Sequence, residues 1–254
     1  MPGAITNVLH RDHSAARVHP DPRILQNIPS EIDGYGVAEM AIPSYFHRNP
    51  FVRYIIRARL DEILRIGGFA PSDVVLDFGT GTGILIPELC QRVSGVLGTD
   101  LRTEIARRMV WLSEIPNARI VELEDFWCLP ANSVSKIVAA DVLEHVENLD
   151  ELLDQFAKLL KPGGSLIISG PTESGFYKLC RRIAGFSGEY HVRSIFDIEE
   201  RLAAKGFRTR VRSRLPVWLP TKMFVVLVCE APLKQAQPKP AARNGEVVAR
   251  VIVR

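Results

Sequence analysis

The chain has 254 residues, of which 46% are hydrophobic and 24% are charged. This composition excludes wholesale disorder, and the length allows one or two domains. The longest uninterrupted apolar run, residues 223–229, is much shorter than the about 20 residues that a membrane-spanning helix needs. The first residues also lack the apolar block of a signal peptide. We therefore expect no transmembrane segment and a cytoplasmic location.

The formal net charge of +3 is concentrated in residues 232–254, where five Lys and Arg residues accompany Glu246 alone. The remainder of the chain has no basic excess, so we expect no nucleic-acid partner. The four cysteines are widely separated and form no Cys-x-x-Cys pair. This spacing argues against a zinc knot or a disulfide framework.

The first expected helix begins at Asn49–Pro50 and ends at Gly67–Gly68. Asn is a favoured N-cap residue, and Pro is well tolerated at the first helical position. Helical spacing predicts a buried face of Phe51, Ile55, Leu60, Ile63 and Leu64, and a polar face of Arg53, Arg57, Asp61 and Glu62. Residues 1–48 are polar and contain several prolines, and we expect them to form a partly flexible N-terminal extension.

Strands and helices then alternate along the chain, which is typical of parallel β-α-β units. The expected strands are residues 74–78, 95–100, 119–124, 136–141, 165–170, 207–213 and 222–230. The expected helices are residues 83–93, 102–114, 149–161, 174–184 and 197–205. The predicted fold is a doubly wound α/β domain, residues 49–231, with a seven-stranded, mostly parallel sheet. Its last two strands have no helix between them and should form an antiparallel hairpin, followed by a flexible basic tail, residues 232–254.

The strongest motif is a glycine-rich loop, Asp77-Phe78-Gly79-Thr80-Gly81-Thr82-Gly83, between an expected strand and an expected helix. Glycines permit a sharp turn and allow a ligand to approach the backbone closely. The dinucleotide fingerprint G-x-G-x-x-G fails here because its third glycine would fall at Ile84. A nicotinamide-dependent dehydrogenase is therefore disfavoured.

The pattern D-x-G-x-G-x-G resembles that of the class I S-adenosylmethionine-dependent methyltransferases, and the resemblance extends from about Pro71 to Cys229. It implies that S-adenosylmethionine is the cofactor and that the loop from Asp77 through Gly79, Gly81 and Gly83 binds it. Asp100, at the end of the second expected strand, would accept hydrogen bonds from both ribose hydroxyls.

The resemblance implies three further cofactor contacts. Asp125 would accept a hydrogen bond from the adenine amine, and Phe126 beside it would flank the adenine ring. Asp141 would line the methionine end of the cofactor. It opens Asp141-Val142-Leu143-Glu144-His145-Val146, which looks like the D-x-L-E-H-V element of small-molecule methyltransferases similar to those of ubiquinone biosynthesis. The implied activity is methyl transfer to a small-molecule acceptor, at oxygen.

His145 is the first candidate for a catalytic base, because the imidazole pKa suits proton transfer near neutral pH. The alternative is that His145 caps a helix or lies beside the cofactor without moving a proton. Tyr190 and His191 are a second candidate pair. Asp141, Glu144 and His145 also raise the question of a divalent metal, but spacing alone does not define a metal site, and we expect none.

Residues 171–191 lie where the resembling family builds its acceptor pocket. Phe176, Cys180 and Ile183 form an apolar stripe, and Lys178, Arg181 and Arg182 lie off it. The pattern is compatible with a packed helix that has a solvated basic side. It is also compatible with a lid that meets a lipid-like or anionic acceptor at a membrane surface. A non-catalytic cofactor-binding protein remains a third possibility, and the sequence leaves the oligomeric state open.

Overall fold

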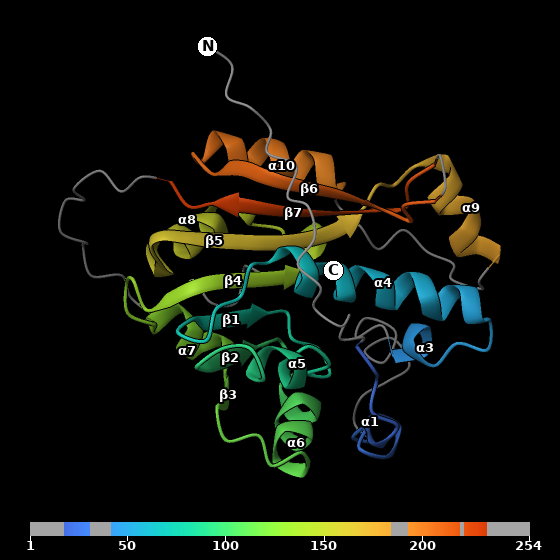
Figure 1. The fold of residues 1–254 in the computed structure, drawn as a ribbon, viewed down its shortest axis with the longest axis horizontal. Helices are drawn as coiled ribbons and strands as arrows, with labels where there is room; N and C mark the ends of the chain where they lie inside the picture. Colours follow the sequence, from blue (N-terminus) through green and yellow to red (C-terminus); the bar gives the residue numbers. More distant parts are fainter. Residues whose placement is uncertain (1–17, 31–41, 184–192, 219–220, 233–254) are drawn as a thin grey trace.

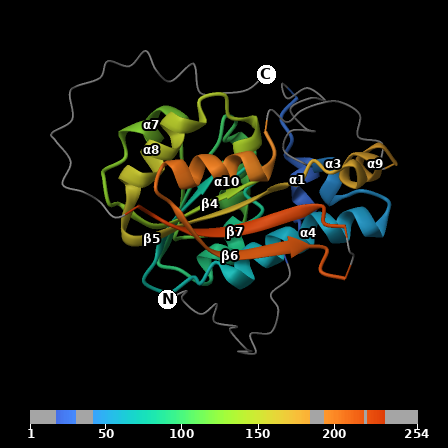
Figure 2. The same cartoon turned by 90° about the horizontal axis from the view of Figure 1, so that it is seen from above.

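A computed structural model describes residues 18–30, 42–183, 193–218 and 221–232. Its centre is a seven-stranded sheet with helices on both faces (Figures 1 and 2). The strands are β1 (Val74–Phe78), β2 (Gly95–Thr99), β3 (Ala118–Val121), β4 (Val134–Ala140), β5 (Leu160–Pro171), β6 (Arg208–Leu215) and β7 (Phe224–Glu230). This architecture confirms the predicted doubly wound α/β fold.

The strand order is β3-β2-β1-β4-β5-β7-β6. The first five strands of this order pair in parallel, whereas β7 pairs antiparallel with both β5 and β6. The predicted antiparallel hairpin is thus confirmed. The chain runs outward from β1 in both directions, so the order reverses between β1 and β4. In open α/β sheets, ligands bind beyond the carboxyl ends of the strands at such a switch point.

Helices bury both faces of the sheet because the strand residues alternate between them. Leu76 and Ile137 face a core formed with α7 (Leu123–Cys128), α8 (Leu149–Leu159) and α10 (Ile195–Ala204). Val75 and Val138 face a second core, formed with α4 (Pro50–Ile66) and α5 (Ile86–Cys90). The remaining elements are α1 (Arg23–Gln26), α3 (Ile42–Tyr45), α6 (Glu104–Leu112), η1 (Leu143–His145) and α9 (Gly175–Ile183).

Helix α4 begins as predicted, with the Asn49 side chain accepting a hydrogen bond from the Phe51 amide. Its buried face differs from the expected one. Phe51 is 36% exposed, whereas Arg59 and Glu62 are buried. The first turns of α4 extend past the sheet, so an apolar residue there has no strand to pack against (Figure 1). These two residues can be buried because each forms an ion pair. Glu62 pairs with Arg65, and Arg59 pairs with Asp141, as described below.

Most predicted boundaries differ from the observed ones by one or two residues, and three differences are larger or change the type of element. The strand predicted for 119–124 ends at Val121, and α7 begins at Leu123, where buried Leu123 and Phe126 turn the chain onto the core. Strand β5 starts at Leu160, inside the segment predicted as helix 149–161. Helix α5 is shorter than residues 83–93. The amides of Gly83 and Ile86 donate to the carbonyls of Thr80 and Gly83, so residues 80–86 form turns and the helix begins only at Ile86.

Part of the expected N-terminal extension packs onto the folded body. Val18 is buried, and its amide donates a hydrogen bond to Asp61 on α4 at 2.6 Å. Ile24 and Ile42 pack in a small cluster with Ile105 on α6. The candidate pair Tyr190 and His191 and the predicted tail after Pro232 lie outside the described residues. Within the described ranges, no helix has both the length and the apolar composition needed to cross a bilayer.

Candidate active site

The glycine-rich loop follows β1 directly and is tied to the end of β2. The amides of Gly79 and Thr80 both donate to the carbonyl of Thr99, at 2.9 and 3.0 Å. The Gly81 amide donates to Oδ2 of Asp100 at 2.7 Å. Gly79, Gly81 and Gly83 all have positive φ, at 74°, 56° and 76°, a conformation that only glycine adopts at little cost. These contacts hold the loop across the carboxyl ends of two adjacent strands.

The space around these glycines shows where a ligand can approach. A Cβ atom on Gly79 would lie 2.6 Å from Cγ2 of Val142, so this glycine permits close packing within the protein. A Cβ atom on Gly81 would meet nothing within 4 Å. The backbone at Gly81 is therefore open on its outer side. It offers the close approach that the cofactor of the resembling family requires.

The buried Asp77 side chain contacts the glycine-rich loop through a hydrogen bond. The residue is 2% exposed, and Oδ2 accepts a hydrogen bond from the Thr80 hydroxyl at 2.7 Å. Burial raises the pKa of Asp77 to about 7, the Thr80 hydrogen bond opposes this rise, and the nearby Asp100 carboxylate adds to it. Its observed contact is with the loop itself, which makes Asp77 a brace for the glycine turn.

Asp100 lies directly after β2, beside the loop. Its two carboxylate oxygens accept from the amides of Gly81 and Arg102, at 2.7 and 3.3 Å. A carboxylate has about four lone-pair sites, so Asp100 retains acceptor capacity for two hydroxyl donors. Burial raises the pKa of Asp100, and its backbone hydrogen bonds oppose that rise. The residue type, position and partners fit the predicted ribose-binding role.

The structure separates Asp125 from Phe126. Asp125 is exposed in the first turn of α7 and is free to face a ligand. Phe126 is fully buried, with its ring centroid 5.1 Å from that of Phe78 and 6.2 Å from that of Phe156. The expectation that Phe126 flanks adenine is therefore wrong for this structure. One face of α7 packs on the core and the other faces solvent, so the neighbouring side chains of Asp125 and Phe126 point in different directions.

Asp141 follows β4 with an unusual backbone, at φ 51°. Oδ1 accepts a hydrogen bond from the Ser169 hydroxyl on β5 at 2.7 Å, and Oδ2 forms an ion pair with Arg59 of α4. Both side chains of the pair are largely buried. The ion pair therefore joins the helix before the sheet to the switch point between β1 and β4.

Arg59 is surrounded by aromatic and acidic side chains. Its guanidinium lies 5.3 Å from the Phe224 ring centroid, and Tyr45 and Tyr177 are buried beside it. Glu144 is 1% exposed, and burial near the Asp141 carboxylate raises the pKa of Glu144 well above its usual value. The result is a buried polar cluster next to the glycine-rich loop.

The sequence interpretation missed Arg59, although a signal was present. Arg59 is four residues after Ile55 and four before Ile63, which places a charge on the apolar face of α4. A charged residue at such a position needs a buried partner. Tyr45 lay in the segment interpreted as an extension and gave no comparable pattern.

His145 ends the short helix η1, and its amide donates to the Val142 carbonyl at 3.1 Å. The residue is half-buried at the carboxyl end of β4, four residues after Asp141. In the described part of the chain, no three acidic, His or Cys side chains are arranged to hold a metal ion. Arg59 also occupies the Asp141 carboxylate that a cation would need.

The fold and this loop define a nucleotide-cofactor-binding α/β protein with its site at the switch point. The family model described as "Methyltransferase domain" matches residues 48–210. The chain belongs to this methyltransferase family and is a class I S-adenosylmethionine-dependent methyltransferase, as the resemblance indicated. Enzymes of this family use S-adenosylmethionine as the methyl donor, and residues 48–210 of this chain form their domain.

Two curated relatives illustrate the range of the family. A ubiquinone biosynthesis O-methyltransferase of Cupriavidus pinatubonensis is 33% identical over 116 residues, which cover 44% of this chain and 46% of the relative. A ubiquinone/menaquinone biosynthesis C-methyltransferase of Hydrogenovibrio crunogenus is 29% identical over 114 residues, covering 41% of this chain and 44% of the relative. The chain thus spans less than half the length of each.

Solved structures confirm the fold. The N-methyltransferase NodS of Bradyrhizobium japonicum, in complex with S-adenosyl-L-homocysteine, superposes with a TM-score of 0.59 at 19% identity, covering 78% of this chain and 97% of NodS. At this identity the similarity concerns the fold alone.

Proposed function

We propose that this methyltransferase transfers the methyl group to an oxygen atom of a small-molecule acceptor. The observation that carries the proposal is one juxtaposition. The open glycine-rich loop, the Asp100 carboxylate and the η1 turn with His145 all lie at the carboxyl ends of β1, β2 and β4. The O-methyltransferase relative supports oxygen as the target atom.

S-adenosylmethionine supplies an electrophilic methyl group on a sulfonium centre. The backbone of Gly79–Gly83 would bind the cofactor by close approach, Asp100 would accept from its ribose hydroxyls, and Asp125 would accept from its adenine amine. Asp141, held by Arg59 and Ser169, would line the methionine end. Holding donor and acceptor in line accounts for about 7–11 kcal/mol of barrier reduction in such reactions.

The role proposed for His145 is to accept the proton of an acceptor hydroxyl. A phenol has a pKa near 10 and gains reactivity when a base removes its proton, whereas a carboxylate acceptor needs no base. His145 is half-buried and lies four residues after Asp141, beyond the carboxyl end of β4, which is compatible with this role.

The direct test supplies the purified chain with isotopically labelled S-adenosylmethionine and three acceptor pools: phenols, carboxylic acids and amines. Product mass spectrometry locates the methyl group. Labelled methyl ethers or methyl esters would support oxygen as the target, and ethers are the products expected if His145 acts as a base. Labelled C-methyl or N-methyl products would refute oxygen as the target. Cofactor binding without S-adenosylhomocysteine formation in any pool, or in a metabolite extract, would favour the non-catalytic alternative.

A further inference from the structure

One end of the molecule presents large apolar side chains to solvent from three separate segments. Phe51 and Tyr54 lie on α4 and are 36% and 49% exposed. Leu179 on α9 is 54% exposed. Val217 and Trp218, in the connection between β6 and β7, are 73% and 60% exposed. We call these five residues the end patch.

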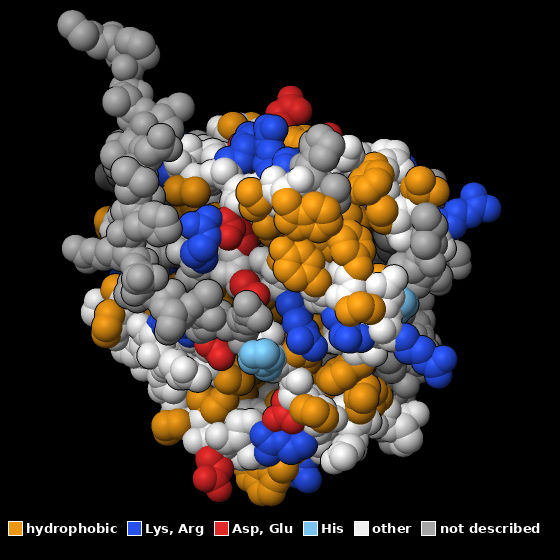
Figure 3. Space-filling view, turned by 45° about the vertical axis from the view of Figure 1, so that its right-hand side comes forward, with side chains coloured by type: hydrophobic (Ala, Val, Ile, Leu, Met, Phe, Trp, Pro, Cys, Tyr) orange, Lys and Arg blue, Asp and Glu red, His pale blue; other side chains and the backbone are white. Residues whose placement is uncertain are grey.

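Two of the three segments that bear the end patch are in direct contact, and the third lies at the same end of the molecule. The ring centroids of Phe51 and Trp218 are 6.1 Å apart in an edge-to-face arrangement, which joins α4 to the β6–β7 connection. The first turns of α4 and the whole of α9 lie at the same end in both ribbon views. Figure 3 shows apolar side chains gathered on this face, with Lys and Arg side chains beside them.

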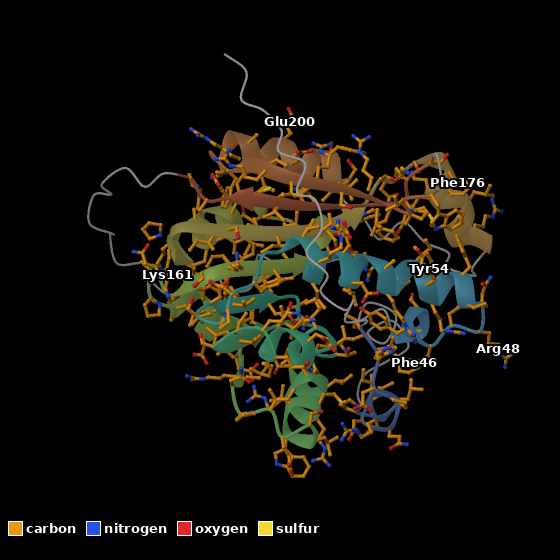
Figure 4. All side chains as sticks on the ribbon, viewed as in Figure 1. Phe46, Arg48, Tyr54, Lys161, Phe176 and Glu200 are labelled. Carbon is orange, nitrogen blue, oxygen red and sulfur yellow. The ribbon has the colours of Figure 1, made fainter. Side chains whose placement is uncertain are left out.

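The segments that bear the end patch carry cations and no acidic residues of their own. Residues 43–60, 174–182 and 213–222 contain no Asp or Glu. They contribute exposed cations at Arg48, Lys178 and Arg182. Figure 4 places Arg48 and Tyr54 at the end where Phe176 of α9 also lies. The nearest acidic partner given by the structure is Glu173, 4.0 Å from the Lys178 ammonium group. The surface therefore complements an anionic partner.

Two further cations shape the surface. Lys222 donates to the carbonyls of Pro216 and Val217, at 3.1 and 3.0 Å, and so holds the connection that presents Trp218. Arg53 donates to the carbonyls of His47 and Arg48. Both are bound to the backbone and fix the segments that bear the patch. Arg48 and Arg182 are exposed, and Lys178 is exposed with the Glu173 carboxylate 4.0 Å from its ammonium group.

An isolated exposed tryptophan elsewhere provides a contrast. Trp111 on α6 is 66% exposed, but the Arg108 guanidinium lies over its ring at 4.6 Å. Its neighbourhood includes Glu104 and Glu114, so the charge there is mixed. Exposure of a large ring is thus not enough to define a docking surface, and Trp111 serves as an internal control.

We propose that the end patch docks the enzyme on an anionic lipid bilayer. Trp and Tyr rings combine an apolar body with a polar edge and favour the membrane–water interface. Exposed Lys and Arg residues add attraction to anionic headgroups. Val217 and Trp218 are adjacent and largely exposed, so both can enter the interfacial region of a bilayer together.

The surface is close to the site. Tyr177 on α9 stacks edge-to-face on Phe224 at 5.5 Å, and Arg59 on α4 lies over the same ring. Helices α4 and α9 thus each have residues in the buried polar cluster, Arg59 and Tyr177, and other residues in the end patch. Docking would bring this side of the site to the bilayer, where an apolar acceptor is concentrated. This delivery step rests on the proposed methyl transfer, but docking does not.

Flotation of the full chain with vesicles tests the proposal. Vesicles of phosphatidylcholine mixed with phosphatidylglycerol should bind the protein, vesicles of phosphatidylcholine alone should bind it weakly, and added salt should release it. Neutralising Arg48 or Lys178 with Gln should weaken binding about fivefold each, from about 1 kcal/mol per cation near an anionic membrane. Trp218→Ala should weaken it further. Trp111→Ala should not, and neither should Arg119→Gln, which neutralises an exposed cation on β3.

Brominated acyl chains give a second readout, because they quench a tryptophan that enters the bilayer. Quenching should survive Trp111→Phe and disappear in Trp218→Phe. The proposal would be overturned if the protein did not bind anionic vesicles, or if the Trp218 and Trp111 variants bound them equally. The end patch would then bind a protein partner or have no partner. Calorimetric S-adenosylmethionine binding without vesicles should be equal in all variants, which separates a failure of docking from a failure of the active site.

Discussion

Arg59 of α4 and Asp141 at the end of β4 form an ion pair in which both side chains are largely buried. The two residues lie on elements far apart in the chain, and Phe224, Tyr45 and Glu144 surround them. The pair therefore fixes α4 against the carboxyl edge of the sheet. It also places the Arg59 guanidinium among several acidic and aromatic side chains.

Removal of Arg59 should destabilise the protein strongly. Arg59→Met should lower the free energy of unfolding by about 3–5 kcal/mol, because it leaves Asp141 buried without its partner. Arg59→Met combined with Asp141→Asn should lose less than the sum of the two single changes. Urea denaturation of the four proteins measures this coupling. Strict additivity would show that the two groups do not interact in solution.

Gly81 should be needed for the cofactor rather than for folding. Gly81→Ala should cost about 1–2 kcal/mol of stability through its positive φ and should also weaken S-adenosylmethionine binding, and Gly81→Val should abolish binding. Gly163→Ala is the matched control, because Gly163 also has positive φ, at 76°, and open space around its Cβ position. Thermal unfolding and calorimetry measure the two effects. Equal cofactor affinity in the Gly81 and Gly163 variants would contradict the loop assignment.

The raised pKa of Asp77 predicts how stability changes with pH. The pKa is about 7 in the folded protein against an ordinary value of 3.8, so between these values the folded state holds a proton that the unfolded chain has released. Stability from this group is therefore present at low pH and is lost as the pH rises from about 4 to 7, with a slope of at most about 1.4 kcal/mol per pH unit.

Denaturation midpoints measured across this pH range test the assignment. Asp77→Asn should flatten the profile, and Glu144→Gln should do the same, since the pKa of Glu144 is raised in the same direction. Glu200→Gln, a change of an exposed carboxylate on α10, is the control. Equal slopes for the wild type and Asp77→Asn through this window would show that Asp77 is ionised in the fold.

The proposed base gives a kinetic prediction. His145→Gln should lower turnover with a hydroxyl acceptor about 10²–10⁴-fold while cofactor affinity changes little. The wild-type rate should rise with pH through a pKa near that of imidazole, and this limb should vanish in the variant. A small loss with an unchanged pH profile would mean that His145 positions the acceptor or caps the turn. Loss of cofactor affinity would place it against the cofactor.

The sequence predicted the sheet well because its signals are local. Alternating strands and helices, the Asn49 cap and the glycine-rich loop each depend on neighbouring residues, and the structure confirms all three. The end of β3 was misjudged because residues 119–124 read as one extended run. The burial of Leu123 against the core, a non-local contact, turns the chain into α7 instead.

The site was predictable only where a motif carried it. Asp77, Gly79, Gly81 and Asp100 lie together in the structure as the pattern implied. Phe126 was assigned to the wrong surroundings because a six-residue helix decides which of its residues faces inward. Arg59 came to the site from α4 through a contact with Asp141, 82 residues further along the chain, and no local pattern names such a partner.

The order of strands at the C-terminal edge has a consequence for assembly of the sheet. β6 pairs only with β7 among the described strands, and β7 lies between β6 and β5. During synthesis, β6 therefore has no place to dock until residues 224–230 have left the ribosome. Until then, β5 presents a bare hydrogen-bonding edge to the surroundings. Nascent chains stalled before Phe224 should accordingly be the species most prone to mispairing and to capture by chaperones.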